Sequence, residues 1–560
     1  MKEFAALLDR LSYSPSRNAK LRLLVDYLRT APDPDRGWAL AALTDGLPFS
    51  FPLRRTLSEI MDRRSDPELF RLSRDYVGDT AETVALIWDQ TRPGIDPTLT
   101  SDPAWSDGYS HVNMQGDTTP LRLGEVISQL AHIDRALLGE RLESWLDGLG
   151  TTERWALLKL LTGALRVGVS ARLAKTAVAE MAAREVTEIE EVWHAIAPPY
   201  EGLFAWIEGR GSIPDVTQAL VFRPLMLSHP LERNDWDALD LAKFWAEWKW
   251  DGIRVQIVSR CEKTALFSRT GDDISRTFPD VVEGCRFDAV LDGELLVVRD
   301  GQVAPFGDLQ QRLNRKIVSK RQLEQFPAHV RLYDALLIDG DDLRLLPLTE
   351  RRTRLEAWHA RTSPPRTDLS AIIAADSKDQ LQQLWAATRD ASIEGIMLKR
   401  RASPYVAGRP KGLWYKWKRA PLTLDCVLMY AQRGSGKRSS YFSDYTFGVW
   451  RDSSSVRREL VPVGKAYFGF TDAELVEIDR WVRNNTVNSF GPVRAVAPKL
   501  VFEVAFDAVQ ASTRHKSGVA MRFPRILRIR WDKPAEEADR LETLLNMMPT
   551  ERPIEVRVKR

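Results

Sequence analysis

The stretch EWKWDGIR, residues 247–254, decides how the rest of the chain is interpreted. In an extended strand the side chains alternate between two faces. Glu247, Lys249 and Asp251 would therefore share one face, and the two tryptophans between them would lie in the core behind it. The pattern predicts a strand that presents a lysine between two carboxylates, although a charged edge strand exposed to solvent would show the same alternation.

The same stretch resembles the K-x-D-G-x-R motif of the covalent nucleotidyltransferases, which are DNA ligases, RNA ligases and mRNA capping enzymes. The resemblance implies that Lys249 attacks the α-phosphate of a nucleotide and carries the nucleoside monophosphate as a phosphoramidate. Free lysine has a pKa of about 10.4, so near neutral pH almost all of it is ammonium without a lone pair. We expect nearby cations, Arg254 among them, and a metal ion to disfavour that charged form. We also expect Lys249 not to form a salt bridge.

The composition is that of an ordinary globular protein with several domains. Of the 560 residues, 44% are hydrophobic and 28% are charged, and the net charge of +3 means that any nucleic-acid surface must be a local patch. Cys261, Cys285 and Cys426 lie too far apart for metal-ligand spacing and are expected to be reduced thiols. The chain shows no signal peptide and no apolar run long enough to cross a bilayer, so we expect a soluble cytoplasmic protein without a membrane partner.

Residues 1–215 are predicted to form an all-helical domain, because apolar side chains recur there at three- and four-residue spacing. Residues 101–119, rich in Asp, Gly and Ser, are expected to form an internal loop. The stretch GALRVGVS, residues 163–170, interrupts the helical pattern with two glycines. Taken alone, this stretch indicates a corner where two helices pack, or a place where the backbone approaches a ligand closely.

The helical pattern ends after residue 215, where two X-Pro steps mark the entry to a new domain. Residues 216–420 mix short β-rich runs with helical segments, which predicts an α+β domain. Residues 421–560 are mostly β-rich, with one helical stretch at 471–485, and this content suits a small barrel of the OB type. The basic segment 433–438 is expected at a hairpin tip, where it is more often a solvated loop than a binding element.

Further motifs follow residues 247–254 in the order that the ligase family requires. The resemblance implies that Arg269, in SRTG, lies near the ribose and the phosphates. It implies that Glu294, in DGE, binds a ribose hydroxyl or a metal ion, although a turn acid at the end of a strand is the plainer interpretation. It also implies that Tyr333 stacks on the purine and that Glu247 and Arg254 contact the nucleotide; a tyrosine in such a strand is otherwise simply core.

The motif EGIMLK, residues 394–399, implies that Glu394 contacts Mg²⁺ or adenosine and that Lys399 reaches the nucleotide. Ideal strand alternation puts Glu394 and Lys399 on opposite faces, so both can serve one site only if the strand bends. Lys416 and Lys418 share one face, and the negative charge of a triphosphate would explain two like charges side by side.

Replicative ligases carry an arginine six residues before the first of these two lysines. Pro410 stands at that position here, and Arg409, one residue earlier, is the candidate for the arginine's ATP-binding role. The final motif is RFPRILRIRWDK, residues 522–533. In the family it orients the pyrophosphate leaving group, which here implies Arg530, Asp532 and Lys533.

The stretch at residues 163–170 also resembles the G-x-L-R-x-G-x-S signature of the helical DNA-binding domain in archaeal and eukaryotic ATP-dependent DNA ligases. The resemblance implies that Arg166, Gly168 and Ser170 face a DNA phosphate backbone, which positions a duplex without reading its sequence.

Together these motifs resemble bacterial ATP-dependent DNA ligases with the three-domain plan of the replicative enzymes. The resemblance implies a helical DNA-binding domain (1–215), an ATP-grasp-like nucleotidyltransferase (adenylation) domain (216–420) and an OB domain (421–560). It further implies ATP and Mg²⁺ as cofactors, nicked duplex DNA as substrate, a monomer, and a nucleoid-associated location. Some bacterial ligases of this build are linked to a repair helicase and an exonuclease, partners that this sequence does not specify.

Three other functions would share some of these features. An RNA ligase or capping enzyme would share the central motifs but would not need the helical domain. An NAD⁺-dependent ligase would be expected to carry a four-cysteine zinc module, which three scattered cysteines argue against. A non-catalytic DNA-binding protein is disfavoured because Lys249, Glu294, Lys416 and Lys418 are all present.

Overall fold

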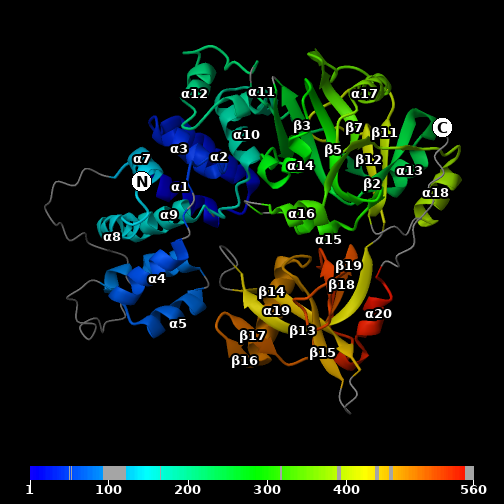
Figure 1. Ribbon diagram of the computed structural model, residues 1–560. Coiled ribbons are helices and arrows are strands. Elements are labelled where there is room, and N and C mark those ends of the chain that lie inside the picture. The colour runs from blue at the N-terminus through cyan, green and yellow to red at the C-terminus, as the bar shows by residue number, and fades with distance from the viewer. Residues whose placement is uncertain are drawn as a thin grey trace.

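The computed structural model in Figure 1 describes residues 1–49, 51, 53–77, 79–91, 121–163, 165–217, 219–260, 262–313, 315, 318–387, 392–419, 421–434, 441–452 and 458–548. The loop predicted at 101–119, Cys261 and most of the basic tip predicted at 433–438 lie outside these residues. The helical region and the central region lie side by side, and the C-terminal region lies below the central one (Figure 1).

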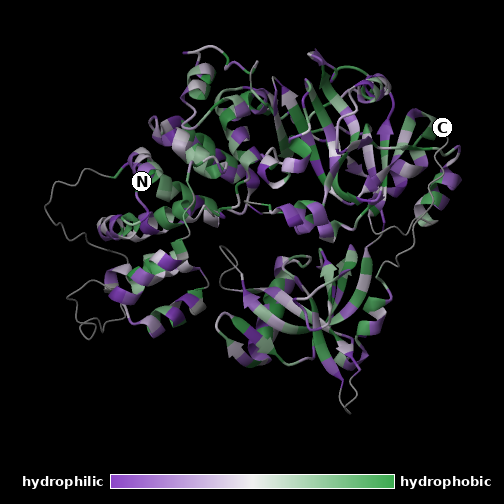
Figure 2. Cartoon of the chain, viewed as in Figure 1, coloured by the Kyte–Doolittle hydropathy of each residue, from purple (hydrophilic) through white to green (hydrophobic). Residues whose placement is uncertain are grey.

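The first part of the chain is helical, as the spacing of its apolar residues predicts. Its helices are α1 (Lys2–Tyr13), α2 (Arg17–Thr30), α3 (Asp35–Leu43), α4 (Leu53–Arg64), α5 (Pro67–Val77), α6 (Thr80–Ile87), α7 (Leu123–His132), α8 (Leu138–Gly148), α9 (Thr151–Thr162), α10 (Ala171–Met181), α11 (Val186–Val192) and α12 (Glu201–Ile207), with 3-10 turns η1 (Trp88–Thr91) and η3 (Trp193–Ala195). In α1 the buried residues Phe4, Leu7, Leu8 and Leu11 form one apolar stripe. Figure 2 shows the mixture of hydrophilic and hydrophobic residues around these helices.

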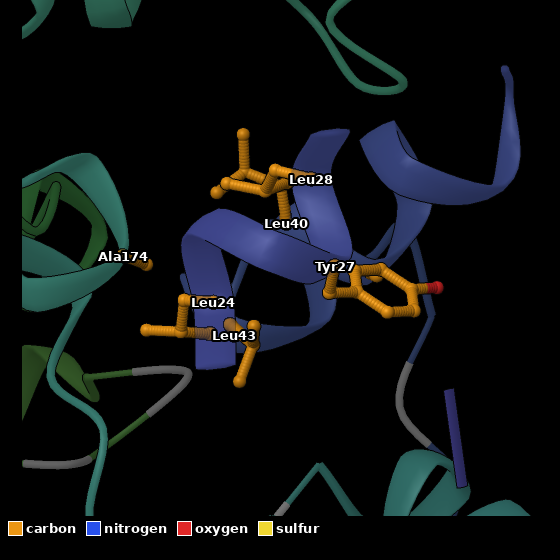
Figure 3. A pocket seen from close by; sticks show the side chains of 7 residues that line it. Leu24, Tyr27, Leu28, Leu40, Leu43 and Ala174 are labelled. Carbon is orange, nitrogen blue, oxygen red and sulfur yellow. The ribbon is translucent and has the colours of Figure 1, made fainter. Parts of the chain in front are cut away.

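One continuous hydrophobic core runs through this helical region, from Met1 to Trp206. Within it a small apolar pocket lies between α2, α3 and α10 (Figure 3). Its lining consists of aliphatic side chains and one tyrosine: Leu24, Tyr27, Leu28, Ala39, Leu40, Leu43 and Ala174. Because none of these side chains is charged, the pocket is a gap in helix packing rather than a chemical site.

The central region contains two sheets. The first has the strand order β1-β12-β11-β2-β10 and consists of β1 (His229–Pro230), β12 (Trp414–Lys418), β11 (Ile393–Arg400), β2 (Phe244–Trp250) and β10 (Ile372–Ile373). The second has the order β4-β3-β5-β7-β8 and consists of β4 (Lys263–Ser268), β3 (Ile253–Arg260), β5 (Ala289–Arg299), β7 (Ala328–Ile338) and β8 (Asp341–Asp342), with β6 (Gln302–Val303) on β5 and β9 (Thr367–Leu369) on β7. This mixture confirms the predicted α+β character.

Short helices surround these two sheets. They are α13 (Arg233–Ala238), α14 (Pro279–Val282), α15 (Phe306–Gln310), α16 (Lys320–Gln325), α17 (Leu348–Thr362) and α18 (Lys378–Ala387), with 3-10 turns η4 (Leu241–Lys243) and η5 (Ser275–Thr277). Trp248 of β2 packs against the apolar cluster formed with α18, as its predicted core position requires. Trp250 instead lies under a cation, with the Arg331 guanidinium 4.2 Å from the centre of its ring.

The two sheets meet at the stretch that the sequence singled out. Only Asp251 and Gly252 separate β2, in the first sheet, from β3, in the second. A Cβ atom on Gly252 would lie 2.5 Å from the carbonyl oxygen of Leu295, so this close approach to β5 requires glycine. The turn at Gly252 therefore places Lys249 on one sheet and Arg254 on the other.

The C-terminal region forms the predicted small barrel. Its strands are β13 (Leu422–Arg433), β14 (Phe442–Arg451), β15 (Glu459–Ala466), β16 (Thr486–Phe490), β17 (Val493–Val496), β18 (Val501–Phe506) and β21 (Arg525–Arg530), with a hairpin of β19 (Ala508–Ala511) and β20 (Val519–Arg522) and with α19 (Asp472–Asn484), η7 (Ala535–Glu537) and α20 (Leu541–Leu545). The long strand β13 pairs with β14 on one side and with β17 and β18 on the other. The Ile526 amide donates to the Phe468 carbonyl at 3.2 Å, which joins β21 to the segment after β15 and closes the curved sheet.

A search of the described helices for a membrane span finds none that is sufficiently long and apolar.

Candidate active site

Lys249 lies on β2 in a row of the first sheet that also contains Gly395 of β11 and Lys418 of β12. Residues directly opposite one another in neighbouring strands share a face, so Lys249 and Lys418 project to the same side. Gly395 between them has no side chain, and a Cβ there would lie 2.1 Å from the Trp417 carbonyl oxygen. The next row places Glu247, Met397 and Lys416 on this face.

Glu394 reaches this face because β11 carries a bulge. The pairing of β11 with β2 shifts between Ile393 and Gly395, so Glu394 is the extra residue. Its carboxylate accepts a hydrogen bond from Lys249 Nζ and lies 3.2 Å from Lys418 Nζ. Burial alone would raise the pKa of Glu394, but the charges of Lys249 and Lys418 lower it to about 2.

The bulge corrects one prediction and satisfies another. The expectation that Lys249 forms no salt bridge is wrong, because the bulge turns Glu394 onto a face that strict alternation denies it. The same bulge is the bend required for Glu394 and Lys399 to share a site.

A second ion pair lies deeper between the same two strands. Lys399 Nζ of β11 donates to Glu247 Oε1 of β2 at 3.0 Å, and both side chains are buried. The ammonium lies 4.2 Å from the ring centre of Tyr333 and 4.9 Å from that of Trp414. Burial lowers the pKa of Lys399, while Glu247 opposes that shift. Lys399 is therefore a fixed buried cation enclosed by a carboxylate and two aromatic rings.

Tyr333 reaches Lys399 through another irregularity. The pairing of β5 with β7 shifts so that Asp292 lies opposite Asp334 and Gly293 lies opposite Leu332, which leaves Tyr333 as the extra residue. This bulge gives Tyr333 an orientation that its position in an ideal strand would not predict.

The second sheet contributes Arg254 and Glu294, which lie opposite each other on β3 and β5. Arg254 donates to the Asp292 carboxylate at 2.7 Å and to the Met226 carbonyl at 2.6 Å, which fixes it in place. Burial raises the pKa of Glu294 to about 7; Lys249 and Arg254 oppose that shift, and Glu394 adds to it. Since Glu294 interacts with charges on both sheets, the two faces meet around it.

Four further cations surround Lys416. Its pKa is lowered first by burial and then by the positive charges of Arg409, Lys418, Arg269 and Lys249. The two lysines of β12, the SRTG arginine and Lys249 therefore form one cationic cluster. Arg409 belongs to it although Pro410 occupies the position of the family's arginine.

Comparisons with known proteins identify the family of this chain. The model of the ATP dependent DNA ligase domain matches residues 226–418, and that of the ATP dependent DNA ligase C terminal region matches residues 438–533. Together they span more than half of the chain. The chain belongs to the ATP-dependent DNA ligases. As a member of this family, it uses ATP to join DNA strands and seals nicks through a lysyl-AMP intermediate.

Relatives extend the match over the helical region. A probable DNA ligase of Koribacter versatilis is 36% identical over 412 residues, which cover 69% of this chain and 70% of that one. DNA ligase 1 of Korarchaeum cryptofilum is 30% identical over 568 residues, covering 97% of each chain. A solved structure named Pmar-Lig_PreS3 is similar in fold, with a TM-score of 0.55 and 15% identity, over 94% of this chain and 99% of that one.

The sequence did not single out one contact of this DNA ligase, which links the barrel to the site. Arg522, at the end of β20, forms an ion pair with the buried carboxylate of Asp251 and lies 4.1 Å over the Phe306 ring. Asp251 belongs to the K-x-D-G-x-R motif and Arg522 begins the R-F-P-R motif. Each residue belongs to a motif, which marks it as a candidate site residue. Their contact could not be predicted, because they lie 271 positions apart and no local pattern relates them.

The three residues predicted for the leaving group lie together on the barrel, and their described contacts are local. Lys533 Nζ lies 2.7 Å from an Asp425 carboxylate oxygen, and Arg530 lies 3.2 Å from the same oxygen. Arg530 also pairs with Asp532 at 3.0 Å and lowers the pKa of Asp532 to about 2. The structure brings these residues together at Asp425, near the start of β13, rather than at Lys249.

The turn predicted to face DNA joins α9 to α10. Arg166, Gly168 and Ser170 are all exposed, and Ser170 Oγ accepts from the Leu173 amide at 3.2 Å and so caps α10. Lys20 of α2 donates to the carbonyls of Val167 at 2.5 Å and Gly168 at 3.2 Å. Lys20 thus anchors the backbone of this turn at Val167 and Gly168, and Arg166 faces solvent.

Proposed function

We propose that Lys249 is the nucleophile of this DNA ligase and that the cationic cluster around Lys416 binds the phosphates of ATP. The observation that carries the proposal is that one sheet face holds Lys249, Glu394, Lys416 and Lys418, with Glu294 of the other sheet interacting with that face. A pairing that serves only stability would not need this accumulation of like charges.

In the first step Lys249 Nζ forms a bond to the α-phosphorus, and the bond between that phosphorus and the pyrophosphate oxygen breaks. Attack requires a neutral amine, so Lys249 must leave Glu394 and lose one proton. Lys416, Lys418, Arg269 and Arg409 would hold the triphosphate, and their charges favour loss of the proton. The same cations would stabilise negative charge on the departing pyrophosphate.

The nucleoside would bind at the deeper end of the site. Tyr333 offers a ring for the purine, and the buried Lys399–Glu247 pair offers polar atoms at the floor. Arg254, fixed by Asp292, would stand beside the ribose and the α-phosphate. Because these side chains are already held by their neighbours, they would lose little conformational freedom when the nucleotide binds.

Glu294 and Glu394 are the proposed Mg²⁺ ligands. Within the described part of the chain no cluster of three or more His, Cys, Asp or Glu residues is arranged to hold a metal by itself. Mg²⁺ is commonly bound by one or two carboxylates together with substrate phosphates, so this pair beside a phosphate site fits. The raised pKa of Glu294 also fits a carboxylate that needs a cation. The ion would neutralise charge on the phosphate oxygens.

In the second step AMP passes from Lys249 to the 5′-phosphate at a nick in duplex DNA, and in the third the 3′-hydroxyl attacks that phosphate and displaces AMP. We propose that Arg166 and the backbone at Gly168 and Ser170 contact the phosphates of the duplex. Arg530, Asp532 and Lys533 would orient pyrophosphate in the first step only, which requires the barrel to move before DNA enters.

We assign DNA binding to residues 1–215, adenylation to 216–420 and the mobile OB domain to 421–560, in a ligase that acts as a monomer on chromosomal DNA in the cytoplasm.

Covalent labelling tests the proposal. Purified ligase incubated with Mg²⁺ and α-labelled ATP is expected to become labelled, and Lys249→Ala is expected to stay at background. Lys243→Ala removes an exposed lysine just before β2 and should label like wild type. Parallel reactions with labelled GTP and NAD⁺ test nucleotide choice. Label retained by Lys249→Ala would show that the nucleophile is another residue.

A further inference from the structure

We infer that His194, in the helical domain, is a positioning residue for Arg269 of the nucleotide site. The inference rests on the ATP-binding role proposed for Arg269. It assigns the helical domain a part in the first step, before any DNA is bound.

His194 lies in η3 and packs against the loop that follows β4. Its Nε2 is 2.9 Å from the carbonyl oxygen of Gly271, in the loop that carries Arg269. Its ring lies 4.8 Å from the Phe267 ring and 6.0 Å from the Phe222 ring, measured between centres. The imidazole is thus enclosed by the adenylation domain, although it belongs to the helical one.

The hydrogen bond has a defined direction. A carbonyl oxygen only accepts, so Nε2 must carry the proton and donate it. Burial lowers the pKa of His194 to about 4, so the ring is neutral at physiological pH with Nδ1 unprotonated. Nδ1 is buried and has no hydrogen-bond partner among the described residues. The polar anchoring of the ring therefore depends on Gly271.

Hydrogen bonds within the loop link its residues to one another. The Gly271 amide donates to the Ser268 carbonyl at 3.0 Å, and the Ser268 amide donates to the Asp272 carbonyl at 2.8 Å. The Thr270 amide also donates to Ser268 Oγ at 3.2 Å. In such a compact turn, fixing the carbonyl of Gly271 also fixes the backbone of Arg269, two residues earlier.

The other end of the chain of contacts is the phosphate site. Arg269 is exposed, and its positive charge is one of four that lower the pKa of Lys416. A path therefore runs from His194 through Gly271 and Arg269 to the proposed triphosphate site. Loss of the anchor would leave Arg269 present but less well oriented, which weakens ATP binding without removing a reacting group.

Full-length variants test this role in single-turnover self-adenylylation, where KM is the ATP concentration that gives half the maximal labelling rate and kcat is that maximal rate. His194→Phe keeps a ring and removes the donor, whereas His194→Gln can offer an amide N–H near the position of Nε2. We expect His194→Phe to raise the KM for ATP about threefold to tenfold, the size of one lost hydrogen bond, with a smaller change in kcat. His194→Gln should recover most of this loss.

A matched control separates positioning from general loosening of the domain contact. Glu191, three residues earlier, pairs across the same contact with Arg344 and lies 3.8 Å from Arg223, but it does not touch the loop. Glu191→Gln should leave the KM for ATP unchanged. In an Arg269→Ala background, His194→Phe should add no further increase, because the group it positions is already absent.

An unchanged KM in His194→Phe, or a full additional increase on top of Arg269→Ala, would overturn the inference alone. An Arg269→Ala variant with normal ATP affinity would overturn the proposed role of Arg269 and the inference with it.

Discussion

Lys249 pairs with Glu394 and Lys399 pairs with Glu247, so two salt bridges of the same chemistry join β2 and β11 in opposite directions. They differ in burial. The side chains of the first pair are 22% and 23% exposed, whereas those of the second are 2% and 4% exposed. Water can compensate the separated charges of the first pair, but it cannot reach those of the second.

This difference separates a pair that can open from a pair that must stay closed. The proposed chemistry needs Lys249 to leave Glu394 and lose a proton in every catalytic cycle. Lys399 has no such requirement, and the rings of Tyr333 and Trp414 keep it in place. One strand pair therefore carries both the proposed nucleophile and a lysine that is held in place.

The largest expected effect is on stability. Lys399→Met leaves Glu247 buried without its partner and should destabilise the first sheet by about 3–5 kcal/mol. Lys249→Met breaks the more exposed pair and leaves Glu394 beside Lys418, so it should cost less, about 1–2 kcal/mol. Hydrogen exchange at the amides of β2 and β11 measures both. Adding Glu247→Gln to Lys399→Met should restore part of the loss; equal effects of the two lysine variants would contradict the comparison.

Breaking the Lys249–Glu394 pair should affect activity more than stability. Glu394→Gln is expected to slow self-adenylylation about 10²-fold, because it removes a proposed metal ligand beside the nucleophile. Unfolding should change by less than in Lys399→Met, about 1–2 kcal/mol, since this pair is only partly buried. Glu356→Gln, an exposed glutamate on α17, is the control. Normal labelling by Glu394→Gln would remove this residue from the site.

A third pair, Lys533 with Asp425, sharpens the comparison because it lies on the barrel. If Asp532 and Lys533 orient pyrophosphate, their double replacement by alanine should slow self-adenylylation about 10²-fold. The same variant should still seal a nick that is supplied already 5′-adenylylated, as should Lys249→Ala, because neither group is needed after AMP has moved. Rapid-quench assays on both substrates distinguish the steps. Failure on the adenylylated nick would mean that the motif contacts DNA or holds the barrel together.

The smallest effect concerns Glu294, whose pKa burial raises from 4.5 to about 7. Below pH 4.5 the Glu294 carboxyl is protonated in both the folded and the unfolded protein, and its contribution to the stability of the fold is fully present. That contribution is lost as the pH rises through 7, because the folded protein holds the proton more tightly than the unfolded one. The loss should amount to about 1–3 kcal/mol at pH 8.5 without metal. Glu294→Gln cannot ionise, so its thermal stability should fall less than that of wild type between pH 5 and pH 8.5. Identical pH profiles would show that Glu294 is not buried uncharged.

Much of this site follows from alternation along single strands. The shared face of Glu247 and Lys249, and that of Lys416 and Lys418, required only the two-residue period. Glu394 and Tyr333 could not be placed in this way, because each is the extra residue of a bulge and no simple pattern marks a bulge.

The contacts between domains were also beyond reach of the sequence. The approach of Arg522 to Asp251 and that of His194 to Gly271 depend on how whole domains pack. The helical, mixed and β-rich character of successive parts of the chain could be predicted because helical and strand periodicity are local properties, whereas the packing of the parts is not.

The connection between β12 and β13 has a consequence for how fast the barrel can act. Strand β12 ends at Lys418 and β13 begins at Leu422, so three residues join the adenylation domain to the barrel. A fully extended chain spans roughly 3.5 Å per residue, so the barrel cannot drift away from the site. The barrel movement proposed for the first step would therefore be an intramolecular event, with an effective concentration set by these three residues and unchanged by dilution of the enzyme. Cutting the chain within these three residues would turn the approach of the barrel to the site into a slow encounter between two molecules.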